Sequence, residues 1–166
     1  MTVDKDLFRQ VAGSFASGVT VITTGRDGNT HGMTASSFSS LSLDPPLILV
    51  CFDLTAATLA AVDAAGAFVV NILGSEQEQI SRQFASRGAH HLDGVEYSTG
   101  ELGLPIIEGS IAHFECRVAR QHLEGDHVIL VGEVIAGGVD RTDDPLLYFR
   151  GSYRELKGLP DLQPAR

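Results

Sequence analysis

Residues 31–47 read HGMTASSFSSLSLDPPL, a run of small hydroxyl side chains that ends at a double proline. A strand that only fills a core alternates apolar side chains with solvated ones. Small side chains let a ligand approach the backbone, and hydroxyl groups bind phosphate or the edge of a heterocycle. Composition alone leaves two interpretations open, a ligand-binding segment or a Ser/Thr-rich edge strand. The hydroxyl groups belong to Thr34, Ser36, Ser37, Ser39, Ser40 and Ser42.

The segments on either side of this stretch predict strands. Residues 19–24 (VTVITT) are rich in β-branched side chains, and residues 26–29 (RDGN) hold the Asp-Gly pair of a hairpin turn. Residues 31–43 would then be the return strand of that hairpin. Residues 47–52 (LILVCF) are apolar on both faces and predict a strand that is central or covered.

Apolar side chains at helical spacing predict three helices, at residues 4–17, 58–65 and 75–86. Asp4 is the expected cap of the first helix and Gly18 its expected end. Ser75 is expected to cap the third helix, in which Ile80 and Phe84 face inward. Further strands are predicted at residues 67–73, 111–122, 127–137 and 146–150. The two long strands join at a turn over residues 124–126, and one face of the first carries Ala112, Phe114, Cys116 and Val118.

Many strands with few helices at the periphery predict a mainly β fold, an antiparallel barrel or closed sheet. A regular alternation of strand and helix, typical of a doubly wound dinucleotide fold, is absent from the pattern. No repeat or linker divides the 166 residues, so we expect a single domain with its core at about residues 4–154. Residues 87–105 are expected to be irregular, and residues 155–166 to form a loose tail.

Composition narrows the classes of partner. The formal net charge of −9 disfavours nucleic acid and anionic membranes, but a few arginines can still bind a phosphorylated small molecule. No apolar run approaches the roughly 20 residues of a membrane helix, and the first residues do not resemble a signal peptide. We therefore expect a cytoplasmic protein with two buried free thiols, Cys51 and Cys116. The six histidines do not have the spacing of metal ligands.

Three further polar clusters could bind a ligand, and each also has a plain structural interpretation. Residues 84–88 (FASRG) end a helix, where Ser86 and Arg87 could bind a phosphate. Alternatively, the positive charge of Arg87 could only interact with the negative end of the helix dipole. Residues 125–127 (GDH) open a strand, and His127 could be an ordinary turn residue. Residues 148–153 (YFRGSY) combine aromatic side chains with Arg150 and could be an edge strand. Together with the hydroxyl-rich stretch, these clusters indicate a site for a large phosphorylated molecule.

In this order, the motifs resemble those of the short-chain flavin reductases, the reductase components of two-component flavin monooxygenases. The resemblance covers roughly residues 4–154 and implies an FMN-binding split barrel, an antiparallel, Greek-key-like β-barrel with peripheral helices. It also implies a homodimer with the pocket near the subunit interface. The matching pieces are FASGVTVITT (15–24), HGMTASSF (31–38), SLDPPL (42–47), FVVNIL (68–73), FASR (84–87), GDH (125–127) and YFRG (148–151).

The resemblance also implies roles for individual residues. Thr58 and the pair Ser86 and Arg87 match positions that bind the flavin phosphate. His127 is the position implied to orient the nicotinamide. The flavin site is implied at Met33, Thr34, Ala35, Ser36, Ser37, Cys51, Phe52, Asp53, Thr58, Phe84, Ser86 and Arg87, and the nicotinamide nucleotide site at His127, Arg150, Gly151, Ser152 and Tyr153. Residues 53–58 (DLTAAT) are less polar than in many relatives, which weakens the expected phosphate contacts.

The implied reaction is hydride transfer from NADH or NADPH to FMN or FAD, which supplies reduced flavin to a partner monooxygenase. The chemistry belongs to the two bound rings, which explains a site of backbone, hydroxyl groups and small residues without a catalytic pair. The absence of a basic cluster for a 2′-phosphate favours NADH. Two alternatives are a split-barrel oxidase of the pyridoxamine-phosphate-oxidase type and a non-enzymatic flavin-binding protein. The sequence does not separate FMN, FAD and riboflavin, or bound flavin from diffusing flavin.

Overall fold

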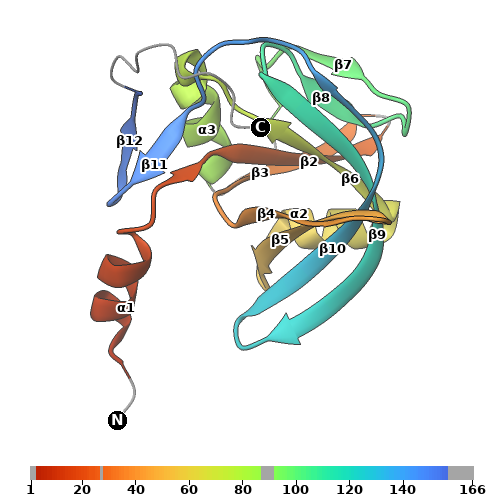
Figure 1. Ribbon diagram of the computed structural model, residues 1–166. Coiled ribbons are helices and arrows are strands. Elements are labelled where there is room, and N and C mark those ends of the chain that lie inside the picture. Colours follow the sequence, from red (N-terminus) through yellow and green to blue (C-terminus); the bar gives the residue numbers. More distant parts are fainter. Residues whose placement is uncertain (1–2, 27, 87–91, 157–166) are drawn as a thin grey trace.

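The computed structural model describes residues 3–26, 28–86 and 92–156. Figure 1 shows a curved sheet with α2 and α3 against it and α1 standing away from it. The elements in chain order are α1 (Lys5–Ala12), β1 (Ser17–Gly18), β2 (Thr20–Arg26), β3 (Asn29–Ala35), β4 (Phe38–Leu43), β5 (Pro46–Asp53), α2 (Ala57–Ala65), β6 (Ala67–Ile72), the 3₁₀ turn η1 (Ser75–Gln77), α3 (Glu78–Ala85), β7 (Tyr97–Thr99), β8 (Pro105–Ile107), β9 (Ala112–Glu124), β10 (His127–Val139), β11 (Leu147–Phe149) and β12 (Ser152–Arg154).

The main sheet has seven strands in the order β3-β2-β6-β9-β10-β5-β4, and every neighbouring pair is antiparallel. This arrangement confirms the mainly β, antiparallel class. The prediction of a closed barrel is corrected, because β3 and β4 are the two edges of this sheet and do not pair with each other. The sheet curves instead, and residues 36–37 carry the chain directly from one edge to the other.

The prediction that residues 31–43 form one return strand is wrong. As predicted, β3 pairs with β2 in a hairpin, but β4 pairs with β5 at the far edge of the sheet. At the corner between them, the Ser37 hydroxyl donates to the carbonyl of Cys51 (3.0 Å) and accepts from its N–H (3.1 Å). The side chain of Ser37 thus makes the bonds that a paired backbone would make, which allows the strand to break here.

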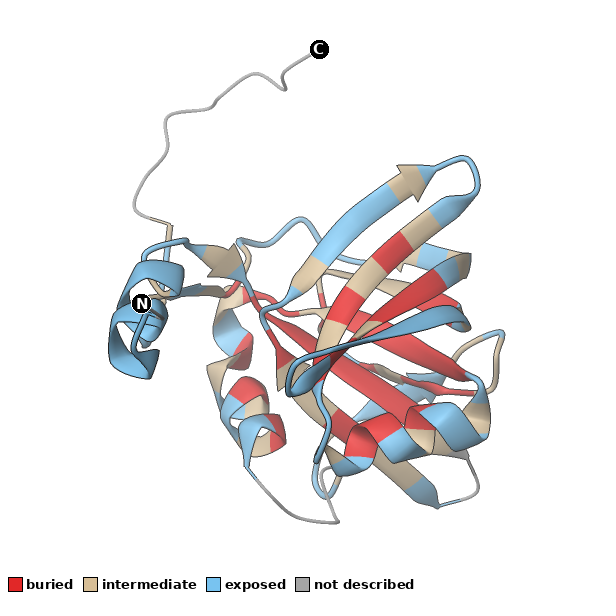
Figure 2. Cartoon of the chain, turned by 90° about the horizontal axis from the view of Figure 1, so that it is seen from below, coloured by how far each residue is buried: buried red, intermediate tan, exposed pale blue. Residues whose placement is uncertain are grey.

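The first helix forms as predicted but is shorter. The Asp4 carboxylate accepts from the N–H groups of Asp6 (3.0 Å) and Leu7 (2.8 Å), as expected of a cap. The helix ends at Gly13 and not at Gly18, because residues 17–18 form β1, which pairs with β11. No residue of α1 is buried (Figure 2), and its side chains belong to none of the apolar cores formed by the described residues.

The other two helices also match their predictions closely. As expected, α2 ends at Gly66, whose φ of +65° lies in the left-handed region. The predicted cap at Ser75 is wrong, because the amide oxygen of Gln77 accepts from the Gly74 N–H at 3.1 Å and takes the capping role. Phe84 is buried and Ile80 is half-buried, so α3 faces inward as predicted.

Residues 92–105 are more ordered than predicted, because β7 and β8 form a two-stranded ladder. A buried carboxylate anchors the loop between these strands: Glu115 accepts from the N–H groups of Glu101 (2.9 Å) and Leu102 (2.7 Å). The sequence pattern missed this anchor, because the contact joins residues far apart in the chain. The remainder of the segment predicted as irregular, and the tail from residue 157 onward, lie outside the described residues.

Two apolar cores lie on the two sides of β2. Ile22 packs into the larger core with Phe52 and Phe68, whereas Val21 packs into a smaller core with Phe84. Residues on a strand alternate between its faces, so β2 is covered on both sides (Figure 2). The pocket described below opens beside these two cores.

The two cysteines are free thiols, as predicted, but only one is fully buried. Cys116, on β9, lies in the larger core. Cys51, on β5, is half-buried on the face of that strand that points away from this core. The prediction that both thiols are buried is therefore corrected for Cys51. On β5, Ile48, Val50 and Phe52 face the core, and Leu47, Leu49 and Cys51 face the more exposed side.

Candidate functional site

A pocket of about 590 Å³ opens between the edge strand β3, the start of α2, the end of α3 and the β11–β12 hairpin. This volume lies in the range of small-molecule and cofactor sites. Asp53 is the one charged side chain on its lining among the residues that the structure describes. The lining consists of Val19, Gly32, Met33, Thr34, Ser36, Asp53, Thr55, Ala56, Ala57, Thr58, Ser81, Phe84, Ala85, Ser86, Tyr148 and Tyr153.

The inner wall of the pocket is a close contact between β3 and α3. A Cβ atom added to Gly32 would lie 2.4 Å from the ring of Phe84, so only glycine allows this approach. One turn earlier on α3, the backbone carbonyl of Ser81 accepts a hydrogen bond from the Thr34 hydroxyl at 2.6 Å. These contacts fix the hydroxyl-rich strand against the helix.

The floor of the pocket is the first turn of α2. The N-cap residue is Ala56, which has no side-chain acceptor for the N–H groups of this turn. Such a turn attracts an anion, since its N–H groups and the helix dipole both point at it. The Thr58 hydroxyl is buried and donates to the Gly32 carbonyl at 3.0 Å. The Thr58 hydroxyl therefore joins α2 to β3. Because this hydroxyl is already bonded, a phosphate at this turn would be bound by the backbone N–H groups of α2.

The outer wall is the β11–β12 hairpin, which turns at Arg150 and Gly151 with φ of +49° and +74°. Tyr148 and Tyr153 lie edge to face, with ring centroids 5.4 Å apart. The Tyr153 hydroxyl is 2.8 Å from the hydroxyl of Ser81, which ties the hairpin to α3. Beyond Tyr153, a second cavity of about 460 Å³ continues between α3 and the hairpin.

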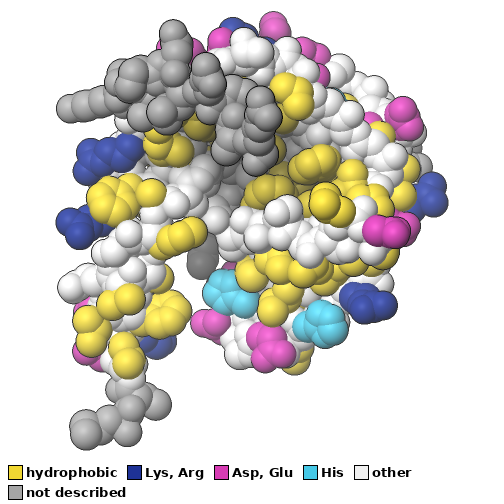
Figure 3. Space-filling view, in the orientation of Figure 1, with side chains coloured by type: hydrophobic (Ala, Val, Ile, Leu, Met, Phe, Trp, Pro, Cys, Tyr) yellow, Lys and Arg dark blue, Asp and Glu magenta, His cyan; other side chains and the backbone are white. Residues whose placement is uncertain are grey.

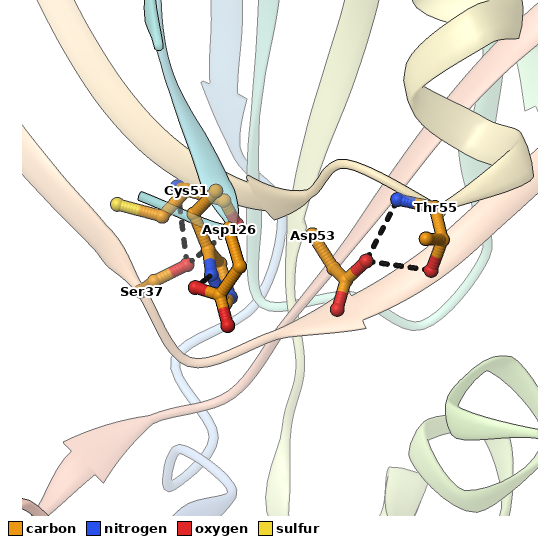
Figure 4. A network of polar contacts seen from close by, with 6 residues as sticks. Ser37, Cys51, Asp53, Thr55 and Asp126 are labelled. Carbon is orange, nitrogen blue, oxygen red and sulfur yellow. Dashed lines mark hydrogen bonds and ion pairs between the residues drawn. The ribbon is translucent and has the colours of Figure 1, made fainter. Parts of the chain in front are cut away.

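His127 lies at a separate rim, where β10 begins. It is the cross-strand partner of Asp53, but it does not line the pocket. Its Nδ1 atom is 2.7 Å from the carboxylate of Asp126, and the hydrogen bond and charge of His127 lower the pKa of Asp126. Figure 4 shows this rim next to Asp53, whose Oδ1 accepts from the N–H (2.7 Å) and hydroxyl (2.6 Å) of Thr55.

The structure brings most of the predicted positions together, and eight of the predicted residues line the main pocket. They are Met33, Thr34, Ser36, Asp53, Thr58, Phe84, Ser86 and Tyr153. Gly151 and Ser152 line the second cavity together with Tyr153. The hydroxyl-rich stretch, the end of α3 and the C-terminal aromatic cluster therefore converge, as the sequence predicted.

Other predicted residues lie elsewhere, and one lies outside the description. Phe52 is fully buried in the larger core, and Ala35 is buried beside it. Ser37 and Cys51 bond to each other at the corner after β3, away from the pocket lining (Figure 4). The guanidinium of Arg150 lies 5.0 Å from the ring centre of Phe149 and lines neither cavity. Arg87 lies outside the described residues.

Sequence reasoning missed eight lining residues. A signal existed for Ser81, which precedes the predicted inward residue Phe84 by one turn of an amphipathic helix. A signal also existed for Gly32 and Tyr148, which stand inside motifs already singled out. The others also stand in segments quoted above, at 15–24, 53–58 and 84–87, but nothing in their residue type marks them as lining residues, because only the tertiary fold places them at the pocket. They are Val19, Thr55, Ala56, Ala57 and Ala85.

The arrangement suits binding of a nucleotide-like molecule more than acid–base chemistry. The pocket offers an uncapped helix start for a phosphate, hydroxyl groups for polar edges and aromatic rings for stacking. Within the described residues, no cluster of three His, Cys, Asp or Glu side chains could hold a metal ion. No helix in the described part of the chain is long and apolar enough to cross a membrane.

The fold and pocket define a cofactor-binding protein built on a curved antiparallel sheet. Residues 12–157 match the family described as flavin reductase like domain, and the chain belongs to this family. It is 40% identical to the flavin-dependent monooxygenase reductase subunit HsaB of Rhodococcus jostii over 155 residues, which cover 93% of this chain and 80% of that protein.

Two further relatives carry names that describe an activity. The chain is 38% identical to the FMN reductase (NADH) SmoA of Agrobacterium fabrum over 146 residues, which cover 88% of this chain and 83% of that protein. Among solved structures, the NADH:FAD oxidoreductase SgcE6 of Streptomyces globisporus superposes with a TM-score of 0.88 at 38% identity, covering 95% of this chain and 98% of that one.

Proposed function

We propose that this protein is an NADH-dependent flavin reductase, which transfers a hydride from NADH to FMN or FAD. The observation that carries the proposal is the pocket, which three family motifs far apart in the chain build together. Membership of the flavin reductase like domain family supports it, as do the NADH-dependent reductase names of the relatives. When bound, the flavin supplies the ring that accepts the hydride.

The residues of the pocket fit a flavin nucleotide. The uncapped first turn of α2 would hold its phosphate through the N–H groups of Ala57 and Thr58, with Ser86 on the opposite side. The backbone and side chains of residues 33–36, at the end of β3 and just after it, would lie along the ring system and its chain. Phe84 and Tyr153 would exclude water from the pocket and limit the positions that the ring can take.

We further propose that NADH enters from the side of the β11–β12 hairpin and that His127 orients it at the rim. His127 is half-exposed and is held by Asp126, so it can turn a ring nitrogen toward a bound amide. This is a positioning role. His127→Ala should raise the KM for NADH more than it lowers kcat, and complete loss of turnover at saturating NADH would contradict the role.

Anaerobic stopped-flow tests the reaction itself. The purified protein is mixed with each combination of FMN, FAD or riboflavin and NADH or NADPH, and bleaching of the flavin absorbance is followed. Rapid bleaching with NADH and a free flavin supports the proposal. Flavin that stays oxidised with either nicotinamide would contradict it. In that case peroxide release with an amine substrate in air would indicate an oxidase.

We propose that the protein is a homodimer. The apolar stripe of α1 supports this, since Leu7, Phe8 and Val11 are 48, 66 and 66% exposed and belong to none of the apolar cores that the described residues form. Figure 3 shows hydrophobic side chains gathered on this helix and also over the main body. The exposed apolar side chains of the sheet strands include Leu41, Leu43, Ile135 and Val139. A second copy would cover such surfaces.

Light scattering after size exclusion tests the homodimer. The wild-type chain should elute at twice its 17.7 kDa mass. Phe8→Glu with Val11→Glu should give a monomer, whereas Lys5→Glu, a charge change at the start of the same helix, should stay dimeric. A monomeric wild-type protein would contradict the proposal.

The remaining proposals concern the setting of the reaction. We propose that reduced flavin passes to a flavin-dependent monooxygenase, because the relatives include reductase subunits of such enzymes. The proposed compartment is the cytoplasm, where NADH is produced. We also propose that residues 1–166 act as one flavin reductase-like domain. Oxygenase activity of a partner that depends on this protein and NADH, persists when catalase removes peroxide, and vanishes when a flavin trap is added would support transfer of reduced flavin through solution.

A further inference from the structure

The second cavity continues the main pocket toward α3. Both cavities are lined by Ala85, Ser86, Tyr148 and Tyr153, so they adjoin along these residues. The lining of the second cavity includes two charged side chains, Glu78 and Arg82, that are not on the lining of the main pocket. The two cavities together therefore suit a dinucleotide, with one ring in the main pocket and its second nucleotide against this charged pair.

The charged pair is a partly exposed ion pair one turn apart on α3, with the Arg82 and Glu78 side chains 65 and 44% exposed. Nε and Nη2 of Arg82 both lie 2.7 Å from the same oxygen, Oε1 of Glu78. The guanidinium also lies 4.8 Å from the ring centre of Tyr153, whose hydroxyl is bonded to Ser81. These contacts hold Arg82 over the aromatic ring and pair its charge. No hydrogen bond of Oε2 of Glu78 is found among the described residues, so this oxygen can accept one from a ligand.

We propose that Glu78 determines the preference for NADH over NADPH. This inference rests on the proposed function, since it assigns the second cavity to the adenosine half of the nicotinamide nucleotide. Oε2 of Glu78 accepts a hydrogen bond from a ribose hydroxyl there. A 2′-phosphate at the same place meets a carboxylate of like charge, while Arg82 is already engaged by Oε1. The pair thus favours the diol and rejects the phosphate.

Two further cavities in the described part of the chain do not offer this discrimination. The cavity along α2 shares only Ala57 with the main pocket, and its lining is mainly alanine, with Asn29 and His31 as its polar side chains. The cavity beside Arg141 shares no lining residue with the main pocket. Among the four, the one that both joins the main pocket by several residues and carries a carboxylate is the cavity at Glu78.

Glu78→Gln is the test, because it removes the charge and keeps the size of the side chain. Steady-state kcat/KM with a free flavin is measured for NADH and NADPH. The NADPH-to-NADH ratio should rise about tenfold or more, as expected when one charge repulsion is removed and one guanidinium is released to a phosphate. Glu76→Gln is the matched control, since Glu76 is an exposed carboxylate two residues away that lines neither cavity. It should leave the ratio unchanged.

A binding experiment gives a readout without turnover. Calorimetry with 5′-ADP and with 2′,5′-ADP should show that the wild-type protein prefers the former and that Glu78→Gln reverses or removes the preference. Adding Arg82→Gln to Glu78→Gln should abolish the gained affinity for 2′,5′-ADP. An unchanged preference in Glu78→Gln, or an equal change in Glu76→Gln, overturns the inference. Failure of the wild-type protein to oxidise NADH at all would instead contradict the proposed function.

Discussion

The inner wall of the pocket and the separate rim at the β9–β10 turn are built in different ways. At the inner wall, Gly32 and Phe84 are buried against each other, and buried Thr58 from the floor bonds to the Gly32 carbonyl. At the rim, the side chains of His127 and Asp126 are 47 and 94% exposed and are joined by one hydrogen bond. Changes to the inner wall should therefore cost folding and flavin binding together, whereas changes at the rim should affect the nicotinamide alone.

Gly32→Val should have the largest effect. The new side chain would start 2.4 Å from the Phe84 ring, and overpacking of this kind costs about 3 kcal/mol of unfolding free energy. Flavin affinity should fall with it, because Phe84 lines the pocket. Urea unfolding and a flavin fluorescence titration measure the two effects. Gly18→Val is the control, since nothing lies within 4 Å of a Cβ atom at that position. Equal stability of the two variants would show that the inner wall is not tightly packed.

Thr58→Val should have the next largest effect. Valine keeps the shape of threonine but leaves the buried Gly32 carbonyl without its hydroxyl donor, which costs about 1–2 kcal/mol. Thr58→Ser keeps the donor and should cost less of the unfolding free energy. Thermal unfolding of the three proteins gives the order. If the hydroxyl instead serves mainly a flavin phosphate, valine would lower flavin affinity and leave the stability of the free protein unchanged.

The two thiols extend the comparison between interior and surface. Burial, with the charge of Glu115 as a smaller cause, raises the pKa of Cys116 from 9.0 to about 12. A thiol reagent at pH 8 should therefore modify half-buried Cys51 in the native protein and reach Cys116 only after unfolding. Mass spectrometry of timed samples distinguishes the two sites. Equal labelling rates would mean that the interior opens readily.

The same shift predicts how stability changes at high pH. The folded state keeps the Cys116 proton until the pH approaches about 12, whereas the unfolded chain loses it near the ordinary value of 9.0. The unfolded state thus binds fewer protons in this window, and stability falls as the pH rises through it. Cys116→Ala should reduce this alkaline slope in a series of urea unfolding curves.

The smallest effect is expected at the rim. The hydrogen bond and charge of His127 lower the pKa of Asp126 below its ordinary value of 3.8, so their contribution to stability is present above that value. It is lost as the pH falls through the lowered pKa. In His127→Asn, the pKa of Asp126 should return toward 3.8, as carboxyl carbon chemical shifts can report. An unchanged titration would mean that the two side chains do not interact in solution.

The parts of the fold that could be predicted are those with a local cause. The pairing of β2 with β3, Gly66 after α2 and the inward Phe84 each follow from the conformational preferences of a few neighbouring residues. The break at Ser37 has no such cause, because its hydroxyl bonds to Cys51, which follows 14 positions later. The early end of α1 likewise depends on pairing of β1 with β11, near the other end of the chain.

The candidate site divides in the same way. Hydroxyl groups, glycines and aromatic side chains at recognisable positions identified three of the segments that form the pocket. The sequence could not show that Phe52 belongs to the core or that Arg150 lies over Phe149, because side-chain direction near strand ends depends on how the strands are paired. It also could not indicate Ala56 and Ala57, whose contribution is backbone N–H groups at a helix start.

The sequence by itself determined the class of this protein. The alternation of apolar and polar residues, the turn residues and the order of the motifs are local patterns that can be recognised in the sequence alone. Only the tertiary structure decided which residues meet. It placed β3 and β4 at opposite edges of one sheet, set α3 against Gly32, and joined two cavities at Tyr153 beside Glu78. The physical reason is that these contacts connect distant parts of the chain, so they exist only once the two cores have packed and fixed the curvature of the sheet.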